Sequence, residues 1–217
     1  MLAINGYKTH SVFENTTKEH FTDYLFWFEN IVIMSSDFNL PLSGLSYNLK
    51  SLYIDSIEFN QPINNLPETL EYLSLISLHF NQPVDNLPYN LKYLQIQSIS
   101  FNQSLDRLPH SLEYLEIWHN SKFIFDLTNL PTNIKKIILE TPSGGYFSKK
   151  PLINLSVLPD TLETLITTYK ITSSFNLPEK LKEIIFTLKC WDTVPDQYKA
   201  DLTVKYPSIH INWINQT

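Results

Sequence analysis

The sequence is poor in several residue types, and each shortage excludes a class of protein. Its 217 residues include four glycines and a single cysteine, Cys190. One cysteine cannot form an intramolecular disulfide or a thiolate-based zinc site, and no glycine-rich loop is present to cradle a phosphate. No run approaches the roughly 18 uninterrupted apolar residues of a membrane span, and the opening MLAINGYKTH lacks the charged start and apolar run of a signal peptide. We therefore expect a cytoplasmic protein that does not enter a membrane.

Basic residues are also scarce. Lysine and arginine number 16 against 22 aspartates and glutamates, which gives a net charge of −6. Because no basic cluster occurs, we expect no nucleic-acid partner. The six histidines are scattered without metal-ligand spacing, and no Gly-x-Ser-x-Gly nucleophile motif is present. We therefore expect a protein that is not an enzyme and that needs no metal or cofactor.

What the sequence does contain is a phrase repeated every 21 residues. Phe38, Phe59, Phe80 and Phe101 each open it, and FNQPINNLPETLEYLSL at 59–75 is one copy. Numbered from this Phe as position 0, leucine-type residues recur at positions 7, 11, 14 and 16. The alternation at 14 and 16 predicts a short strand with one buried face, and the proline at position 8 belongs to the return loop. Such a period is typical of a solenoid, in which each turn buries its apolar face against its neighbours.

The pattern extends beyond the four complete phrases and predicts a single domain over 1–217. We expect an α/β, leucine-rich-repeat-like solenoid with one parallel sheet of about nine short strands, irregular return arcs, and helical caps at both ends. The predicted parts are an N-terminal cap and first strand (1–37), repeats with an insertion near 141–150 (38–187), and a C-terminal cap (188–217). A capping box at 16–19 predicts one helix. Pro195 and Pro207 bound the other, which precedes a last strand at 208–214.

The Leu-x-x-Leu-x-Leu core resembles leucine-rich repeats. The fuller phrase, Phe-Asn-Gln-Pro-Ile followed by Leu-Pro-x-x-Leu-x-x-Leu-x-Leu, resembles the FNIP repeat, known mainly from social amoebae and the giant DNA viruses that infect them. The resemblance is specific over 38–117 and weaker over 118–187. It implies the host cytoplasm as the location if the chain is viral. Larger members often carry an F-box, which implies an alternative function as a substrate-recruiting adaptor of a ubiquitin ligase, although this sequence shows no recognisable F-box.

Positions 13, 15 and 17 point away from the buried leucines, toward the side that we expect to be concave. Position 13 carries Tyr72, Tyr93 and Tyr114 in successive units, flanked by Tyr53 and Trp118. Tyrosine and tryptophan commonly anchor protein interfaces, because they offer a large contact area at a small entropy cost. The alternative is a stacked ladder that only stiffens the sheet. Both interpretations stay open at this point.

A second candidate surface lies in the later units. Ile138, Ile166 and Ile185 share position 15, and an uncovered apolar row usually marks an interaction site. The insertion beside them carries Tyr146 and Phe147. It either folds over the isoleucines or acts as a contact loop.

Position 12 alternates in charge without exception. Adjacent turns are about 4.8 Å apart, so each charge is expected to meet the opposite sign on both sides. The row reads Glu29, Lys50, Glu71, Lys92, Glu113, Lys135, Glu163, Lys182. We interpret it as structural. The sequence as a whole predicts a non-catalytic module, a monomer or weak homo-oligomer, that binds a protein partner of unknown identity on its concave face.

Overall fold

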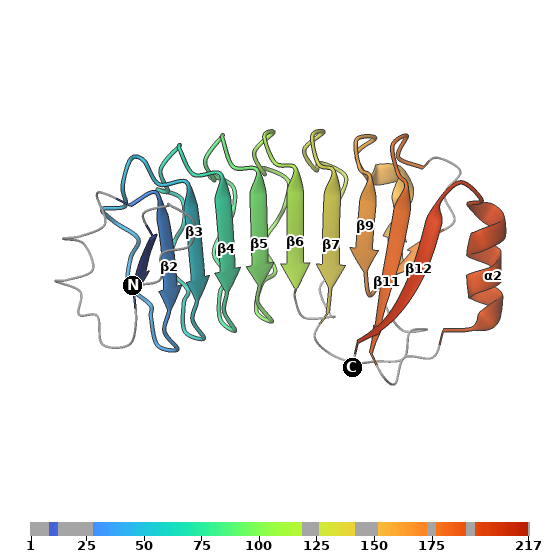
Figure 1. The fold of residues 1–217 in the computed structure, drawn as a ribbon, viewed down its shortest axis with the longest axis horizontal. Helices are drawn as coiled ribbons and strands as arrows, with labels where there is room; N and C mark the ends of the chain where they lie inside the picture. The colour runs from blue at the N-terminus through green and yellow to red at the C-terminus, as the bar shows by residue number, and fades with distance from the viewer. Residues whose placement is uncertain are drawn as a thin grey trace.

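One parallel sheet dominates the structure. The computed structural model describes residues 9–12, 28–118, 126–141, 152–172, 177–189 and 194–216. Ten strands lie side by side in chain order (Figure 1). They are β1 Thr9–Val12, β2 Asn30–Met34, β3 Ser51–Asp55, β4 Tyr72–Ile76, β5 Tyr93–Gln97, β6 Tyr114–Trp118, β7 Lys136–Glu140, β9 Thr164–Thr167, β11 Glu183–Lys189 and β12 His210–Gln216. The molecule is therefore a β-solenoid.

Smaller elements occupy the later part of the chain. Strand β8 (Leu152–Asn154) pairs with β10 (Lys170–Thr172) in a separate two-stranded sheet, and the short 3-10 helix η3 (Leu155–Val157) follows β8. Helix α2 (Asp196–Lys205) lies beside β12 at the end of the sheet (Figure 1). No helix within the described ranges combines the length and apolar character needed to cross a bilayer.

The nine predicted strands all form, but the prediction of about nine is one short. Strand β1 is the tenth, and its sequence, THSV, carries none of the leucine pattern that revealed the others. The predicted C-terminal helix is present as α2, whereas the helix predicted from residue 16 lies outside the described residues. The α/β classification is not confirmed, because α2 is the only α-helix in the described part of the chain and the arcs between repeats are irregular.

The core follows directly from the register. From β3 to β6, each strand residue pairs with the residue 21 places later in the chain. Leu52, Leu73, Leu94 and Leu115 therefore lie in one line across the sheet. All four side chains are fully buried. On the return side the phenylalanines of the repeat stack with ring centroids 5.9, 6.0 and 6.1 Å apart. The phenylalanines that open the repeats thus form a buried spine.

The asparagine and glutamine that follow each phenylalanine bond to the previous turn. The backbone N–H of Asn81 donates to Oδ1 of Asn60 at 2.9 Å. The Gln82 Nε2 atom donates to the Asn60 backbone carbonyl at 3.0 Å. Return arcs have no sheet partner, and an unpaired buried backbone group is costly. These side chains therefore supply the hydrogen bonds between turns in the region where the backbone hydrogen bonds of the sheet end.

A serine at position 18 fixes the turn that follows each strand. The hydroxyls of Ser56, Ser77 and Ser98 donate to the carbonyl of the phenylalanine 18 residues earlier, at 2.8 Å in every case. All three serines are buried. The turns after β3, β4 and β5 consequently share one geometry, and whatever side chains flank the serines are placed in straight rows.

The alternating charges of position 12 form ion pairs between several turns, and Glu71 is paired on both sides. The Glu71 carboxylate accepts a hydrogen bond from the Lys92 Nζ at 2.7 Å and lies 3.5 Å from the Lys50 Nζ. Glu113 pairs with Lys135 at 2.7 Å, and Glu163 pairs with Lys182 at 2.6 Å. The row therefore joins successive turns and avoids contact between like charges.

Truncating one ring of the spine should destabilise the whole solenoid. Phe80 is fully buried between two other rings, so Phe80→Ala should lower the free energy of unfolding by about 3–5 kcal/mol. Tyr89, in the same repeat, is 65% exposed, and Tyr89→Ala should change it by less than about 0.5 kcal/mol. Chemical denaturation of both variants measures the difference. Equal unfolding midpoints for the two variants would contradict a stabilising role of the phenylalanine spine.

The Glu71 ion pairs should make stability depend on pH. The hydrogen bond from Lys92 lowers the pKa of the Glu71 carboxyl, so its contribution is present above the unfolded pKa of about 4.3 and is lost as pH falls through the folded value. Because the pair is exposed, Glu71→Gln should cost only about 0.2–1 kcal/mol at neutral pH and less in salt. In acid the variant and the unmodified chain should converge. Urea midpoints at both pH values test this, with the exposed Glu179→Gln as the control.

Candidate functional site

Three tyrosine rings form a continuous stack on the outward face of β4, β5 and β6. The Tyr72 and Tyr93 centroids are 4.1 Å apart with planes 13° from parallel, and Tyr93 and Tyr114 are 4.3 Å apart at 14°. We call these three residues the tyrosine stack. They meet because position 13 pairs with position 13 along the sheet. At one end the Lys136 Nζ lies 5.4 Å from the Tyr114 ring centre, within the range of a cation–π contact.

The hydroxyl ends of the stack are held as well. The Tyr114 hydroxyl donates to Oε2 of Glu116 at 3.0 Å. Burial raises the pKa of Tyr93, and the hydrogen bond with Tyr72 raises it further. Burial also raises the pKa of Tyr114, with the Glu116 charge as the next cause. The three rings are half-buried, and each one packs against a neighbouring ring.

A line of polar side chains runs beside the stack at position 15. The Ser74 hydroxyl donates to Oε1 of Gln95, and Gln95 Nε2 donates to Oε1 of Glu116 at 2.8 Å. Gln97 Nε2 donates to the same Glu116 oxygen at 3.3 Å. Tyr53 belongs to this row, next to Ser74 in the register, and so lies outside the stack. Burial raises the pKa of Tyr53, followed by the effect of the nearby Asp55 carboxylate.

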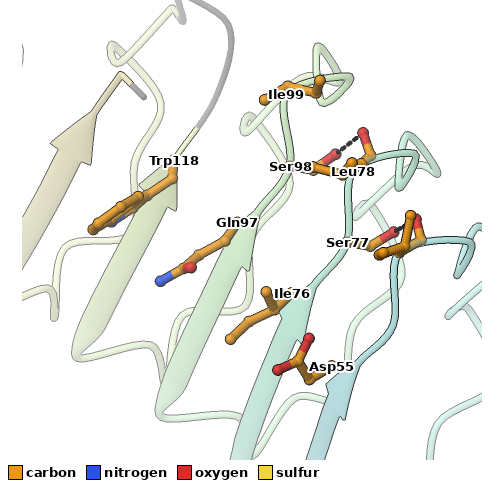
Figure 2. Close-up of a pocket in the computed structure, with 9 residues that line it drawn as sticks. Asp55, Ile76, Ser77, Leu78, Gln97, Ser98, Ile99 and Trp118 are labelled. Carbon is orange, nitrogen blue, oxygen red and sulfur yellow. Dashed lines mark hydrogen bonds between the residues drawn. The ribbon is translucent and has the colours of Figure 1, made fainter. Parts of the chain in front are cut away.

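A groove crosses the carboxyl ends of β3 to β6. This feature is called the groove below, and its volume is about 210 Å³. It is lined by Asp55, Ile57, Ile76, Ser77, Leu78, Gln97, Ser98, Ile99 and Trp118. These are residues of positions 17, 18 and 19 only. Figure 2 shows the position-17 side chains in one row, with Leu78 and Ile99 in the turns beyond the strand ends. The groove therefore runs along the solenoid axis, between two rows of side chains.

The floor of the groove offers no free hydroxyl proton. Ser77 Oγ lies within hydrogen-bond distance of the carbonyls of Ile57 and Phe59, at 2.9 and 2.8 Å. Ser98 is bonded in the same way to Leu78 and Phe80, at 3.2 and 2.8 Å. Because both hydroxyl protons are already used in hydrogen bonds, the groove offers a ligand mainly its apolar walls. Trp118 closes one end, and its buried Nε1 has no hydrogen-bond acceptor within the described residues.

The apolar wall at position 19 was not predicted as a site. Ile57, Leu78 and Ile99 are 46%, 45% and 45% exposed, which is unusual for large aliphatic side chains in consecutive turns. The sequence signal was present, because three aliphatic residues recur at one position outside the strand. It points to a surface only once the turn geometry shows that position 19 faces solvent.

The remaining predicted residues lie apart from this region. Ile138, Ile166 and Ile185 form one row across β7, β9 and β11, as the register predicted, and each side chain is half-buried. Tyr146 and Phe147 fall outside the described residues, so the choice between a covering loop and a contact loop stays a prediction. In the parts of the chain that the structure describes, no group of three or more acidic, histidine or cysteine side chains could hold a metal ion.

Comparison with protein families matches residues 80–118 to the FNIP Repeat model. This range begins at the stacked Phe80 and ends at Trp118, so it covers β5, β6 and four of the nine residues that line the groove. The chain contains FNIP repeats. A search of the curated proteins finds no match to the chain.

The FNIP phrase is scaffold in this structure. Its phenylalanine is buried, its asparagine and glutamine bond to the previous turn, and its aliphatic residue, Ile63 or Val84, is 1% exposed. None of these residues reaches the outward face. The tyrosine stack is built by position 13 and the groove by positions 17 to 19, none of which is a defining residue of the FNIP phrase.

Tyr93 and Tyr114 should ionise only in strong alkali. Burial raises the pKa of both side chains, so the folded chain keeps these protons above about pH 10, and the stability that this proton retention reflects is lost as pH rises past that value. In an absorbance titration of phenolate, Tyr93→Phe should remove signal from the highest-pH part of the curve. Tyr114→Phe should remove signal from the same part of the curve. Loss of the Tyr93 signal near pH 10 would contradict a buried stack.

Proposed function

We propose that the chain is a non-catalytic protein-binding module that docks its partner on the outward face of β3 to β6. We expect this face to be the concave one. The observation that carries the proposal is the tyrosine stack, in which three rings are held 4.1 and 4.3 Å apart. Rings that are already ordered lose little conformational entropy on binding, which is why such residues commonly anchor interfaces.

The surroundings of the stack favour binding over a purely structural ladder. A ladder that only stiffened the sheet would need the ring contacts and nothing beyond them. Here an open groove with exposed aliphatic walls lies on the same four strands. Aromatic anchors next to an apolar hollow resemble the contacts found at the centre of protein interfaces.

The family match and the fold are consistent with the same class of function, a protein-interaction module. The FNIP repeats and the solenoid fold support an interaction module, and we propose the cytoplasm as its location. The role of ubiquitin-ligase adaptor stays a prediction from the family resemblance. We propose the isoleucine row across β7, β9 and β11 as a second contact area of the same module, with Tyr146 and Phe147 as its predicted neighbours.

Partner capture by matched variants tests the proposal. Tyr93→Ser with Tyr114→Ser should abolish the capture of proteins that the unmodified chain retains from its native cell. The control replaces Tyr47 and Tyr89, which are 83% and 65% exposed on the return side, with serine and should leave capture unchanged. Circular dichroism confirms that both variants fold. An identical set of captured proteins with the stack variant would overturn the proposal.

A further inference from the structure

The groove has features that select one kind of occupant. Its walls are aliphatic side chains and one indole, its floor hydroxyls are committed, and Asp55 is the single ionisable residue among those that line it. We propose that the groove binds an amphipathic helix of a partner protein, with an apolar stripe along the axis and a basic residue beside Asp55. This inference rests on the proposed function, because it specifies the partner of the same module.

The spacing of the wall favours a helix over an extended segment. Ile57, Leu78 and Ile99 follow one another at the strand spacing of about 4.8 Å. A helix lying along this row presents one apolar side chain per turn, every 5.4 Å or so. An extended chain presents one every ~6.7 Å, and a polyproline helix one every ~9.3 Å.

The difference between the side-chain spacing of the ligand and the spacing of the wall residues distinguishes these three conformations. Across the two intervals from Ile57 to Ile99, a helix falls out of step by about 1.2 Å. An extended chain falls out of step by roughly 3.8 Å over the same distance, close to one whole strand spacing. Only the helix keeps its successive side chains opposite successive gaps in the wall. Helix-in-groove binding is also an established mode of recognition for apolar clefts.

Charge fixes the end at which the basic residue lies. Asp55 is on β3 and Trp118 on β6, three strand spacings away, or roughly 14 Å. Figure 2 shows the Asp55 carboxylate in the same row as Ile76, Gln97 and Trp118. No lysine or arginine is among the lining residues. A basic side chain on the helix therefore has one favourable position, next to β3, and an acidic one has none.

The groove and the tyrosine stack can be tested separately. Position 13 precedes position 17 by four residues, which is about 13 Å along a strand. No residue of the stack lines the groove, so substitutions in the stack remove none of the side chains that line it. The groove variants are Asp55→Lys and Leu78→Ser, both at side chains that are at least partly exposed, so neither removes a core residue. Glu58→Lys makes the same charge change at an exposed position outside the lining and serves as the control.

Selection from two display libraries is the experiment. One library randomises the apolar face and the flanks of a stable helix, and the other contains linear random peptides of equal length. Against the full chain, the helical library should yield sequences with aliphatic residues on successive turns and a Lys or Arg at one end. Selected helices should bind Leu78→Ser at least tenfold more weakly. Asp55→Lys should shift the selected end residue to Asp or Glu, and Glu58→Lys should leave the preference unchanged.

Each other outcome overturns the inference. Enrichment from the linear library alone would assign the groove to an extended segment, and no enrichment from the helical library would exclude a helix. In a further outcome, the selected helices bind Leu78→Ser as tightly as the unmodified chain and yet lose affinity for the Tyr93→Ser, Tyr114→Ser variant. That outcome would contradict the groove as the binding site but would still support the proposed function. A dimer in solution that Leu78→Ser dissociates would assign the groove to a second copy of the chain.

Discussion

The registered stacking of one turn on the next is the constraint on which the rest of this molecule depends. Because residue n pairs with residue n + 21 from β3 to β6, every side chain has a copy of its own position as a neighbour. A residue type can recur at one position in successive turns only if it packs against itself at about 4.8 Å spacing. Leucine does so in the core, phenylalanine in the spine, and asparagine through its own side-chain amide.

Charge is the one property that cannot repeat under this constraint, and the sequence shows how the conflict is resolved. Identical charges at position 12 would repel from turn to turn, so the position alternates between Glu and Lys, and the ion pairs form across the turns. The tyrosine stack ends at β7, where Lys136 takes the place of tyrosine and its Nζ lies 5.4 Å from the centre of the last ring.

The same constraint explains how much the sequence could predict. Positions that repeat are read easily, so the strands, the buried leucines, the phenylalanine spine and the tyrosine row were all predictable from the 21-residue period. Strand β1 was not, because THSV is short and carries no repeat signal. The groove was missed because its outline depends on where the backbone turns after each strand. That turn is set by Ser56, Ser77 and Ser98 through bonds to carbonyls 18 residues earlier, which no local pattern reveals.

A scaffold built by exact repetition places strict limits on where recognition can arise. The rigid rows offer a partner evenly spaced contacts, and this favours ligands that are themselves periodic. Specificity then has to come from the positions that break the repetition. In the groove these are the four residues of position 17, where Asp55, Ile76, Gln97 and Trp118 differ in charge, size and hydrogen bonding, while each of the first three is followed by the same serine. A change at position 17 can therefore alter the preferred partner without disturbing the core, because position 17 lies outside the stacked spine and the buried leucine rows.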